Sequence, residues 1–296
     1  MRAVDLFCGA GGMSAGLMDA GIEVVTALDH WDVAVNTYNR NIGEHAEPCD
    51  LSVVEAASTR VGASAPDIIV AGPPCQDFST AGKRVEGRQA NLTVAFAEIV
   101  ATCGPDFFLM ENVPQVRRSR AYRMLRNILS EYQIAETCLD ASLCGVPQVR
   151  KRFFAFGSRW GQAVADRWVS HVVRPQTAHR LTVKEYLGDE INVEFYYRHP
   201  RNYSRRSVFS VHEPSPTIRA VNRPVPPNYT GNRLDSAPPS LVRALTSYER
   251  SRIQTFPASW DWAAPNRNGN VERQIGNAVP VNLAAHVGRS VVHAVQ

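Results

Sequence analysis

The sequence predicts an α/β protein with a doubly wound, mostly parallel sheet and a second, smaller, irregular domain. Over roughly the first 160 residues, short apolar runs alternate with helical stretches, which is the pattern of strands crossing over through helices. Several of these runs end in glycine or in polar residues. Beyond them, Pro, Asn, Ser and Arg dominate and the periodic apolar spacing is lost. We therefore expect a first domain at 1–165, completed by 266–296, and a small domain at 166–265.

The individual elements follow from the apolar runs and their spacing. Runs of four or more apolar residues bounded by turn residues predict strands, and longer amphipathic stretches predict helices. Strands are expected at 3–7, 23–28, 67–71, 107–110 and 152–157, and helices at 14–20, 93–103, 120–132, 241–252 and 281–295.

Composition excludes several classes of protein. No stretch approaches the ~18–20 uninterrupted apolar residues of a membrane span. Asp5 stands where a signal peptide would place its apolar core, so we expect a cytoplasmic protein with no membrane partner. The six cysteines include no CxxC pair, which argues against a zinc site or a disulfide framework, and no metal is expected. The net charge of +4 is too small to indicate a partner, but only three of the 32 basic residues are lysines. Arginine suits phosphates and base edges, although a GC-rich genome would also favour it.

The first two predicted strands end in groups that suit a nucleoside-containing cofactor. The first runs into a glycine-rich turn at 8–12 that opens a helix, where the backbone can approach a ligand and free N–H groups face it. The second ends at Asp29, a place where an acid commonly holds ribose hydroxyls. A purely structural tight turn would explain the glycines but not the acid.

The next strand ends carry groups for catalysis. Two prolines fix the backbone directly before Cys75, which predicts a rigidly projected nucleophile. Glu111 follows a buried strand, in an apolar setting that raises a carboxyl pKa and lets it share a proton with a ring nitrogen. Arg150 and Arg152 alternate along an extended segment and should therefore share a face.

Two segments carry features of nucleic-acid contact. Between residues 198 and 233 there are seven arginines and one acid, with aromatic residues interleaved. The polar stretch 76–91 contains two glycines and three basic residues, and we expect it to close over a bound substrate. The structural alternative is a solvated loop face for the arginine-rich segment and ordinary surface disorder for the stretch 76–91.

Taken in order, these blocks resemble the DNA (cytosine-5)-methyltransferase family, in its bacterial restriction-modification or orphan type. The resemblance rests on six segments and leaves out only the region from about 160 to 240, which would correspond to the family's variable target-recognition region. The six segments are 5–12, 72–79, 111–113, 148–152, 243–257 and 276–280.

The resemblance implies methyl transfer from S-adenosyl-L-methionine to C5 of a flipped-out cytosine in duplex DNA, with S-adenosyl-L-homocysteine as product. Cys75 would add to C6, Glu111 would engage N3 and the exocyclic amine, and Arg152 would hold O2 with Arg150 beside it. The expected cofactor residues are Phe7, Cys8, Gly9, Ala10, Gly11, Gly12, Asp29, His30, Asp50, Leu51, Pro74, Asn277 and Val279. His30 departs from the aromatic residue that often stacks on adenine in the family.

Duplex DNA is the expected partner, with a cognate restriction endonuclease in the same system, and the protein is expected to be a monomer. Two alternatives remain open: C5-cytosine methylation of a structured RNA, and a catalytically silent DNA-binding module. The expected DNA-binding residues are Gln76, Ser79, Lys83, Arg84, Arg88, Arg198, Arg201, Arg205, Arg206, Arg219 and Arg223.

Overall fold

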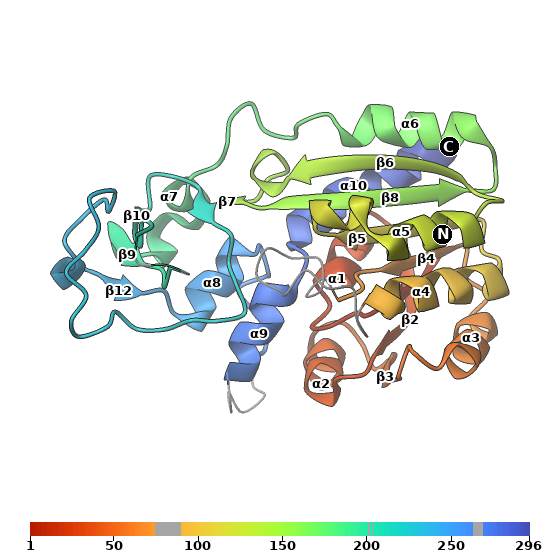
Figure 1. Cartoon of the computed structure of the whole chain (residues 1–296), viewed down its shortest axis with the longest axis horizontal. Helices are drawn as coiled ribbons and strands as arrows, with labels where there is room; N and C mark the ends of the chain where they lie inside the picture. Colours follow the sequence, from red (N-terminus) through yellow and green to blue (C-terminus); the bar gives the residue numbers. More distant parts are fainter. Residues whose placement is uncertain (75–89, 201, 203, 263–268) are drawn as a thin grey trace.

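A seven-stranded sheet forms the centre of the larger part of the molecule in the computed structural model (Figure 1). The structure describes residues 1–74, 90–200, 202, 204–262 and 269–296. The first five strands in spatial order are parallel, and β8 runs antiparallel to both of its neighbours. The predicted mostly parallel sheet is therefore confirmed. The spatial order is β3 (Ala46–Pro48), β2 (Glu23–Asp29), β1 (Arg2–Leu6), β4 (Ile68–Ala71), β5 (Phe107–Asn112), β8 (Lys151–Ser158) and β6 (Gln133–Asp140).

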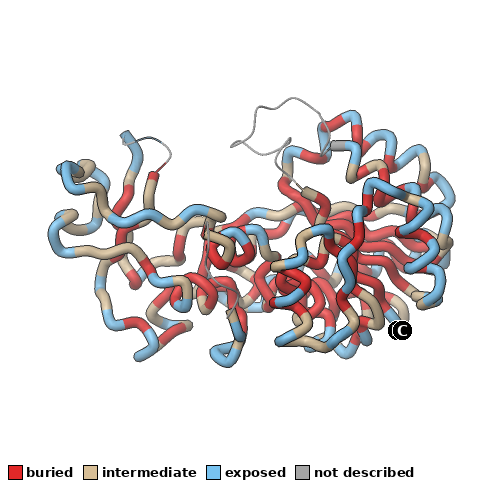
Figure 2. Tube along the Cα trace, turned by 90° about the horizontal axis from the view of Figure 1, so that it is seen from below, coloured by how far each residue is buried: buried red, intermediate tan, exposed pale blue. Residues whose placement is uncertain are grey.

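Helices cover both faces of this sheet, as a doubly wound fold requires. On one face, Leu17, Trp168 and Leu283 belong to one buried apolar cluster. On the other, Phe96 and Leu125 belong to a second. Figure 2 shows buried residues gathered in the interior of the larger part and exposed residues around its outside. The helices are α1 (Gly12–Asp19), α2 (Asp32–Asn41), α3 (Val54–Ala63), α4 (Ala90–Cys103), α5 (Arg120–Ile128), α6 (Gln162–Val172) and α10 (Val281–Val295), with the 3₁₀ segments η1 (Pro114–Arg118) and η2 (Ala141–Leu143).

The smaller part is built from short elements around its own apolar cluster, which includes Val183, Tyr196, Ile253 and Ile275. Three strands form a small sheet in the order β10-β9-β12, and β11 pairs with β7. The strands are β7 (Gln148–Val149), β9 (Phe195–Tyr197), β10 (Val208–Ser210), β11 (Ser215–Pro216) and β12 (Arg243–Ala244). The helices are α7 (Val183–Leu187), α8 (Ser247–Ile253) and α9 (Asn270–Asn277), with η3 (Gly188–Glu190) and η4 (Pro239–Leu241).

The chain passes from one apolar core to the other at positions that differ from the predicted domain boundaries after residues 165 and 265. Trp168 and Val172 of α6 lie in the core of the large sheet, so the chain leaves that sheet only after α6. Helix α9, expected with the first domain, places Val271 and Ile275 in the smaller core. The return to the large sheet comes at Val279.

Several predicted elements end elsewhere than the sequence suggests. The helix expected to reach Tyr132 ends at Ile128, because the edge strand β6 begins at Gln133. The helix expected from Leu241 begins only at Ser247, where Thr246 and Glu249 form a capping box. In the described part of the chain, no helix is both long and apolar enough to cross a membrane.

Candidate active site

The glycine-rich turn between β1 and α1 has a tightly wound backbone. Phe7, Gly9 and Gly11 have φ values of 60°, 55° and 90°, in the left-handed region that favours glycine. The N–H of Gly9 donates to Asp29 Oδ2 at 2.9 Å, so the turn is tied to the end of β2. Cys8 and Ala10 are buried, and burial raises the pKa of the Cys8 thiol. Only their backbone groups are therefore placed to meet a ligand.

The glycines of the turn serve two different purposes. A Cβ at Gly9 would meet no atom within 4 Å, so this position faces open space. A Cβ at Gly12 would lie 2.4 Å from the carbonyl oxygen of Val279. The C-terminal segment thus packs directly on the turn, as the sequence leads us to expect. Asn277 is exposed and Val279 is buried beside it.

Asp29 organises the end of β2. Its Oδ1 accepts from the N–H of Trp31 at 2.9 Å and lies 3.3 Å from Nδ1 of His30. The hydrogen bond with Asp29 raises the pKa of His30, whose side chain is exposed. Beyond β3, Asp50 is exposed and accepts from Ser52, whereas Leu51 is buried in the core.

Asp5 is a buried acid that the sequence does not single out as a site residue. One oxygen accepts from the Ser14 hydroxyl at 2.6 Å. The other, Oδ1, is buried and has no hydrogen-bond partner among the described residues. Burial raises the pKa of Asp5 to about 7. The sequence feature that could have identified Asp5 is its position as an acid inside the apolar run at 3–7.

Glu111 and Arg152 form an ion pair at the carboxyl end of β5. Arg152 Nε lies 2.7 Å from Glu111 Oε1, and both side chains are nearly buried. Burial raises the pKa of Glu111, while the charges of Arg152 and Arg150 oppose the rise. A raised carboxyl pKa favours the protonated form, which can donate a proton.

The end of β4 lies directly beside this acid. A Cβ at Gly72 would lie 3.6 Å from Glu111 Oε2, and Asn112 donates to the carbonyl of Pro73 at 3.1 Å. Pro74 is half-buried and ends the described segment. Of the predicted residues, Cys75, Gln76, Ser79, Lys83, Arg84, Arg88 and Arg201 lie outside the described residues.

Arg150, predicted to lie beside Arg152, binds backbone carbonyls of other segments. Its guanidinium is buried and donates to the carbonyl oxygens of Ile218, Gly276 and Ala278 at 3.1, 3.1 and 2.9 Å. Since these carbonyls come from distant parts of the chain, Arg150 joins the β7–β8 stretch to the segment at Ile218 and to the segment at 276–278. Its charge still acts on Glu111.

Two buried glutamines extend this connection, and the sequence does not single them out as site residues. Gln148 donates to Gln254 at 2.7 Å and accepts from the N–H of Ile218 at 2.8 Å. Gln254 donates to the carbonyls of Ile275 and Ala278. The sequence feature that could have identified them is their position in two of the six segments of the resemblance, 148–152 and 243–257.

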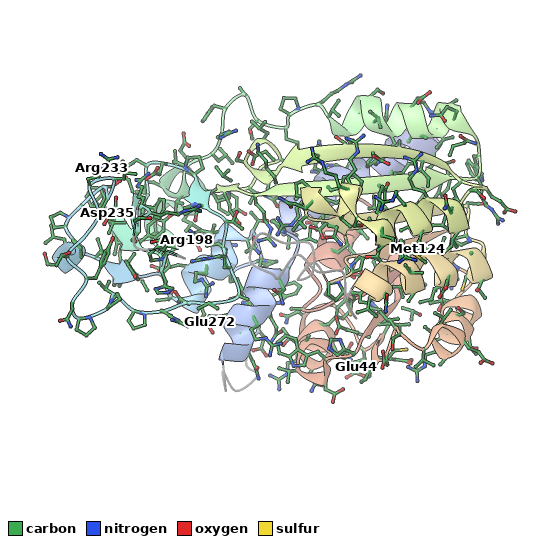
Figure 3. The ribbon with its side chains drawn as sticks, viewed as in Figure 1. Glu44, Met124, Arg198, Arg233, Asp235 and Glu272 are labelled. Atoms are coloured by element: carbon green, nitrogen blue, oxygen red, sulfur yellow. The ribbon has the colours of Figure 1, made fainter. Side chains whose placement is uncertain are left out.

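The arginines of the smaller part divide into two groups; Figure 3 labels Arg198 and Arg233 there. Arg198, Arg206 and Arg219 bind their own loops: Arg198 donates to the Thr217 carbonyl, Arg206 pairs with Glu213, and Arg219 donates to the His199 carbonyl. Arg205 and Arg223 are exposed. Of these five arginines, only Arg205 and Arg223 are exposed to solvent.

Comparison with known proteins agrees with this geometry. The family model for C-5 cytosine-specific DNA methylases matches residues 1–293. The chain belongs to this family. It is a DNA (cytosine-5)-methyltransferase, and the resemblance drawn from the six sequence blocks is confirmed.

Two relatives match this methylase over almost its whole length. The type II methyltransferase M.HgiDI of Herpetosiphon aurantiacus is 47% identical over 294 residues, covering 98% of this chain and 94% of the relative. The type II methyltransferase M.HindV of Haemophilus influenzae is 43% identical over 301 residues, covering 99% and 97%.

Solved structures share the fold of the methylase at low sequence identity. A putative DNA modification methyltransferase from an E. coli prophage superposes with a TM-score of 0.72 at 21% identity, covering 100% of this chain and 99% of that one. The Dnmt2 methyltransferase of S. pombe gives a TM-score of 0.71 at 18% identity, with the same coverage. The predicted methyltransferase fold is therefore confirmed.

Proposed function

We propose that this methylase acts through a covalent bond between Cys75 Sγ and C6 of a cytosine flipped out of duplex DNA, with Glu111 as the proton donor at N3. The observation that carries the proposal is the buried Glu111–Arg152 pair beside Gly72–Pro74, directly before Cys75. A duplex hides the faces of its bases, so the target must leave the stack to reach this pair.

The Cys75 thiolate adds to C6 while the proton of Glu111 moves to N3, so that an electron pair becomes available at C5. C5 takes the methyl group and loses its own proton to a base, the thiolate leaves to restore the C5–C6 double bond, and N3 returns its proton to Glu111. Arg152 is proposed to hold O2 of the ring and to keep Glu111 aligned. Arg150 is proposed as a positioning residue, since its donors are bound to backbone carbonyls.

S-adenosyl-L-methionine would supply an electrophilic methyl group on sulfonium. The turn suits it in three respects: open space at Gly9, the Asp29 carboxylate at the end of β2, and the unpartnered Asp5 Oδ1 among the described residues. We propose that Phe7, Gly9, Gly11, Gly12, Asp29, His30, Asp50, Leu51, Pro74, Asn277 and Val279 line this site, with Cys8 and Ala10 contributing backbone groups.

We propose that the smaller part reads the target sequence. Exposed Arg205 and Arg223 are placed for contacts with DNA, and Arg198, Arg206 and Arg219 stabilise the loops that present them. The roles expected of Gln76, Ser79, Lys83, Arg84, Arg88 and Arg201 in DNA contact remain proposals from the sequence. We also propose a cognate restriction endonuclease as partner, in keeping with the type II names of the relatives, and, from the sequence alone, action as a monomer in the bacterial cytoplasm.

Mechanism-based trapping tests the covalent step. Bisulfite sequencing of DNA from expressing cells first identifies the target sequence. Duplex DNA carrying 5-fluorocytosine at that target should then form a denaturant-stable adduct with the wild type and with Cys138→Ala, whose thiol is on an exposed residue. Cys75→Ala should form none. A wild type that methylates the target without forming an adduct would exclude the covalent mechanism, and methylation of tRNA but not of duplex DNA would favour the RNA alternative.

A further inference from the structure

A strongly basic surface lies on η1 and α5, away from the smaller part of the molecule. Five arginines are exposed there within a short stretch, and no Asp or Glu occurs between Pro114 and Ile128. The buried side of α5 is apolar and belongs to the core. Met124, which Figure 3 labels on α5, is 39% exposed. The five residues, named here the α5 arginines, are Arg117, Arg118, Arg120, Arg123 and Arg126.

Three of these arginines, Arg117, Arg123 and Arg126, line a groove of about 420 Å³ between α5 and the edge strand β6, and the other two are exposed on the same stretch of chain. On its floor, Glu136 lies 2.7 Å from Arg117 Nε, 2.8 Å from Arg126 Nη1, and accepts from the Tyr122 hydroxyl at 2.8 Å. One carboxylate thus orients two guanidinium groups, each of which carries five N–H donors. The groove is lined by Arg117, Tyr122, Arg123, Arg126, Asn127 and Glu136, so three positive charges face one negative charge.

The spacing of the arginines is unfavourable for a helix that only faces water. Arg120, Arg123 and Arg126 follow one another at intervals of three along α5, where like charges lie close together and repel. A solvated helix face normally alternates acidic and basic residues, and η1 and α5 have no acid to alternate. An anionic partner laid along the helix would remove this repulsion.

The position of the groove relative to Glu111 indicates the partner. Segment η1 leads directly from β5, which ends with Glu111 and Asn112, into α5. In the sheet, Glu111 pairs with Phe154, and Phe154 pairs with Thr137, the neighbour of Glu136. Two strand spacings, about 10 Å, therefore separate the backbones of Glu111 and Thr137, and the side chain of the next residue, Glu136, lies on the α5 face of the sheet. Helix α5, with nine residues, is roughly 13 Å long, which equals about four base pairs of DNA rise.

We propose that the α5 arginines bind backbone phosphates of the duplex that flanks the target cytosine on one side. The inference rests on the proposed action on a flipped cytosine in duplex DNA. The groove adds affinity without reading sequence, because phosphate contacts position a duplex and base edges specify it.

Binding of duplexes with different flanks tests this inference. Arg118→Gln/Arg123→Gln leaves both arginine partners of Glu136 in place, and Arg60→Gln/Arg174→Gln removes two exposed arginines from α3 and from the turn after α6. Fluorescence anisotropy would compare a short duplex around the target with duplexes lengthened on either side by about ten base pairs, roughly 34 Å. Bound S-adenosyl-L-homocysteine and the urea midpoint would show that each variant is folded.

Lengthening one flank, and only one, should tighten binding by the wild type, and the Arg118/Arg123 variant should lose that gain. Its salt slope on the lengthened duplex should be about 1.8 units shallower, at about 0.9 for each of two phosphates, so that between 50 and 200 mM salt the wild type loses roughly twelvefold more affinity than the variant does. The Arg60/Arg174 variant should behave as the wild type.

Equal salt slopes of DNA affinity in both double variants would overturn the inference, and so would an equal gain in affinity from lengthening either flank. It would also be overturned if the Arg118/Arg123 variant lost affinity for a hairpin RNA but not for duplex DNA. Methylation of the target by the wild type is measured separately. If the wild type methylates duplex DNA but the Arg118/Arg123 substitutions do not change DNA binding, only the proposed phosphate contact is rejected. If the wild type does not methylate duplex DNA, the proposed function is rejected.

Discussion

The contact between Gly12 and Val279 predicts a measurable cost for a single added methyl group. In Gly12→Ala the new Cβ would lie 2.4 Å from the Val279 carbonyl oxygen and 3.2 Å from Cζ of Phe256. The oxygen belongs to the backbone, so no side-chain rotation relieves the contact. Reaching an ordinary separation requires a movement of about 0.6–1.0 Å between the glycine turn and the C-terminal segment, and overpacking of this kind costs about 1–3 kcal/mol.

Gly62→Ala in α3 is the matched control. Its Cβ would meet no atom within 4 Å, so alanine should stabilise that helix by about 0.5–1 kcal/mol. Urea denaturation would give the free energy of unfolding of both variants, and their difference isolates the crowding. Calorimetry with S-adenosyl-L-homocysteine should show weaker binding for Gly12→Ala alone. If the two variants were equally stable and bound this product equally, the proposed coupling between the turn and the C-terminal segment would be refuted.

Four further outcomes are expected. Glu111→Gln should lower methyl incorporation into target DNA by about 10²–10⁴-fold while product binding is kept, since the amide has no proton to give to N3; wild-type activity would remove Glu111 from the mechanism. Burial raises the pKa of Asp5 from 3.8 to about 7, so its contribution to stability is complete below pH 3.8 and is lost as the pH rises through about 7. Without cofactor, the free energy of unfolding of Asp5→Asn, relative to that of the wild type, should therefore increase by up to about 4 kcal/mol from pH 4 to pH 8. Parallel profiles of stability against pH for the two proteins would contradict this. Arg150→Gln removes the donor at the carbonyls of Ile218 and Gly276 and one of the two donors at Ala278, and should cost several kcal/mol, at about 1–3 for each carbonyl left without a donor, in urea denaturation; a loss below about 0.5 would contradict its positioning role. Arg223→Gln should weaken DNA binding with unchanged stability, whereas Arg206→Gln should lower the melting temperature, and the opposite pattern would reverse the two roles.

The sequence predicted those parts of the methylase in which local structure and chemistry coincide. The strand ends near Asp29 and Glu111 lie where the apolar runs stop, and the closing helix spans the predicted 281–295. The edge strand β6 was missed because its residues, Gln133–Asp140, mix polar and apolar types. The order of the six blocks was enough to indicate the family, since each block is a continuous stretch of chain.

Tertiary structure decided what depends on groups from distant parts of the chain. Arginine is the same residue in the sequence at positions 150, 206 and 223, yet one is buried among backbone carbonyls, one is paired with Glu213, and one is exposed. The glycines at 9 and 12 look alike in the sequence, but only the second touches Val279. Composition and spacing determine which groups are present and which strand end carries them. Their partners are fixed only when the sheet brings separate segments together, because hydrogen bonds and packing contacts act over a few ångströms in space and not along the chain.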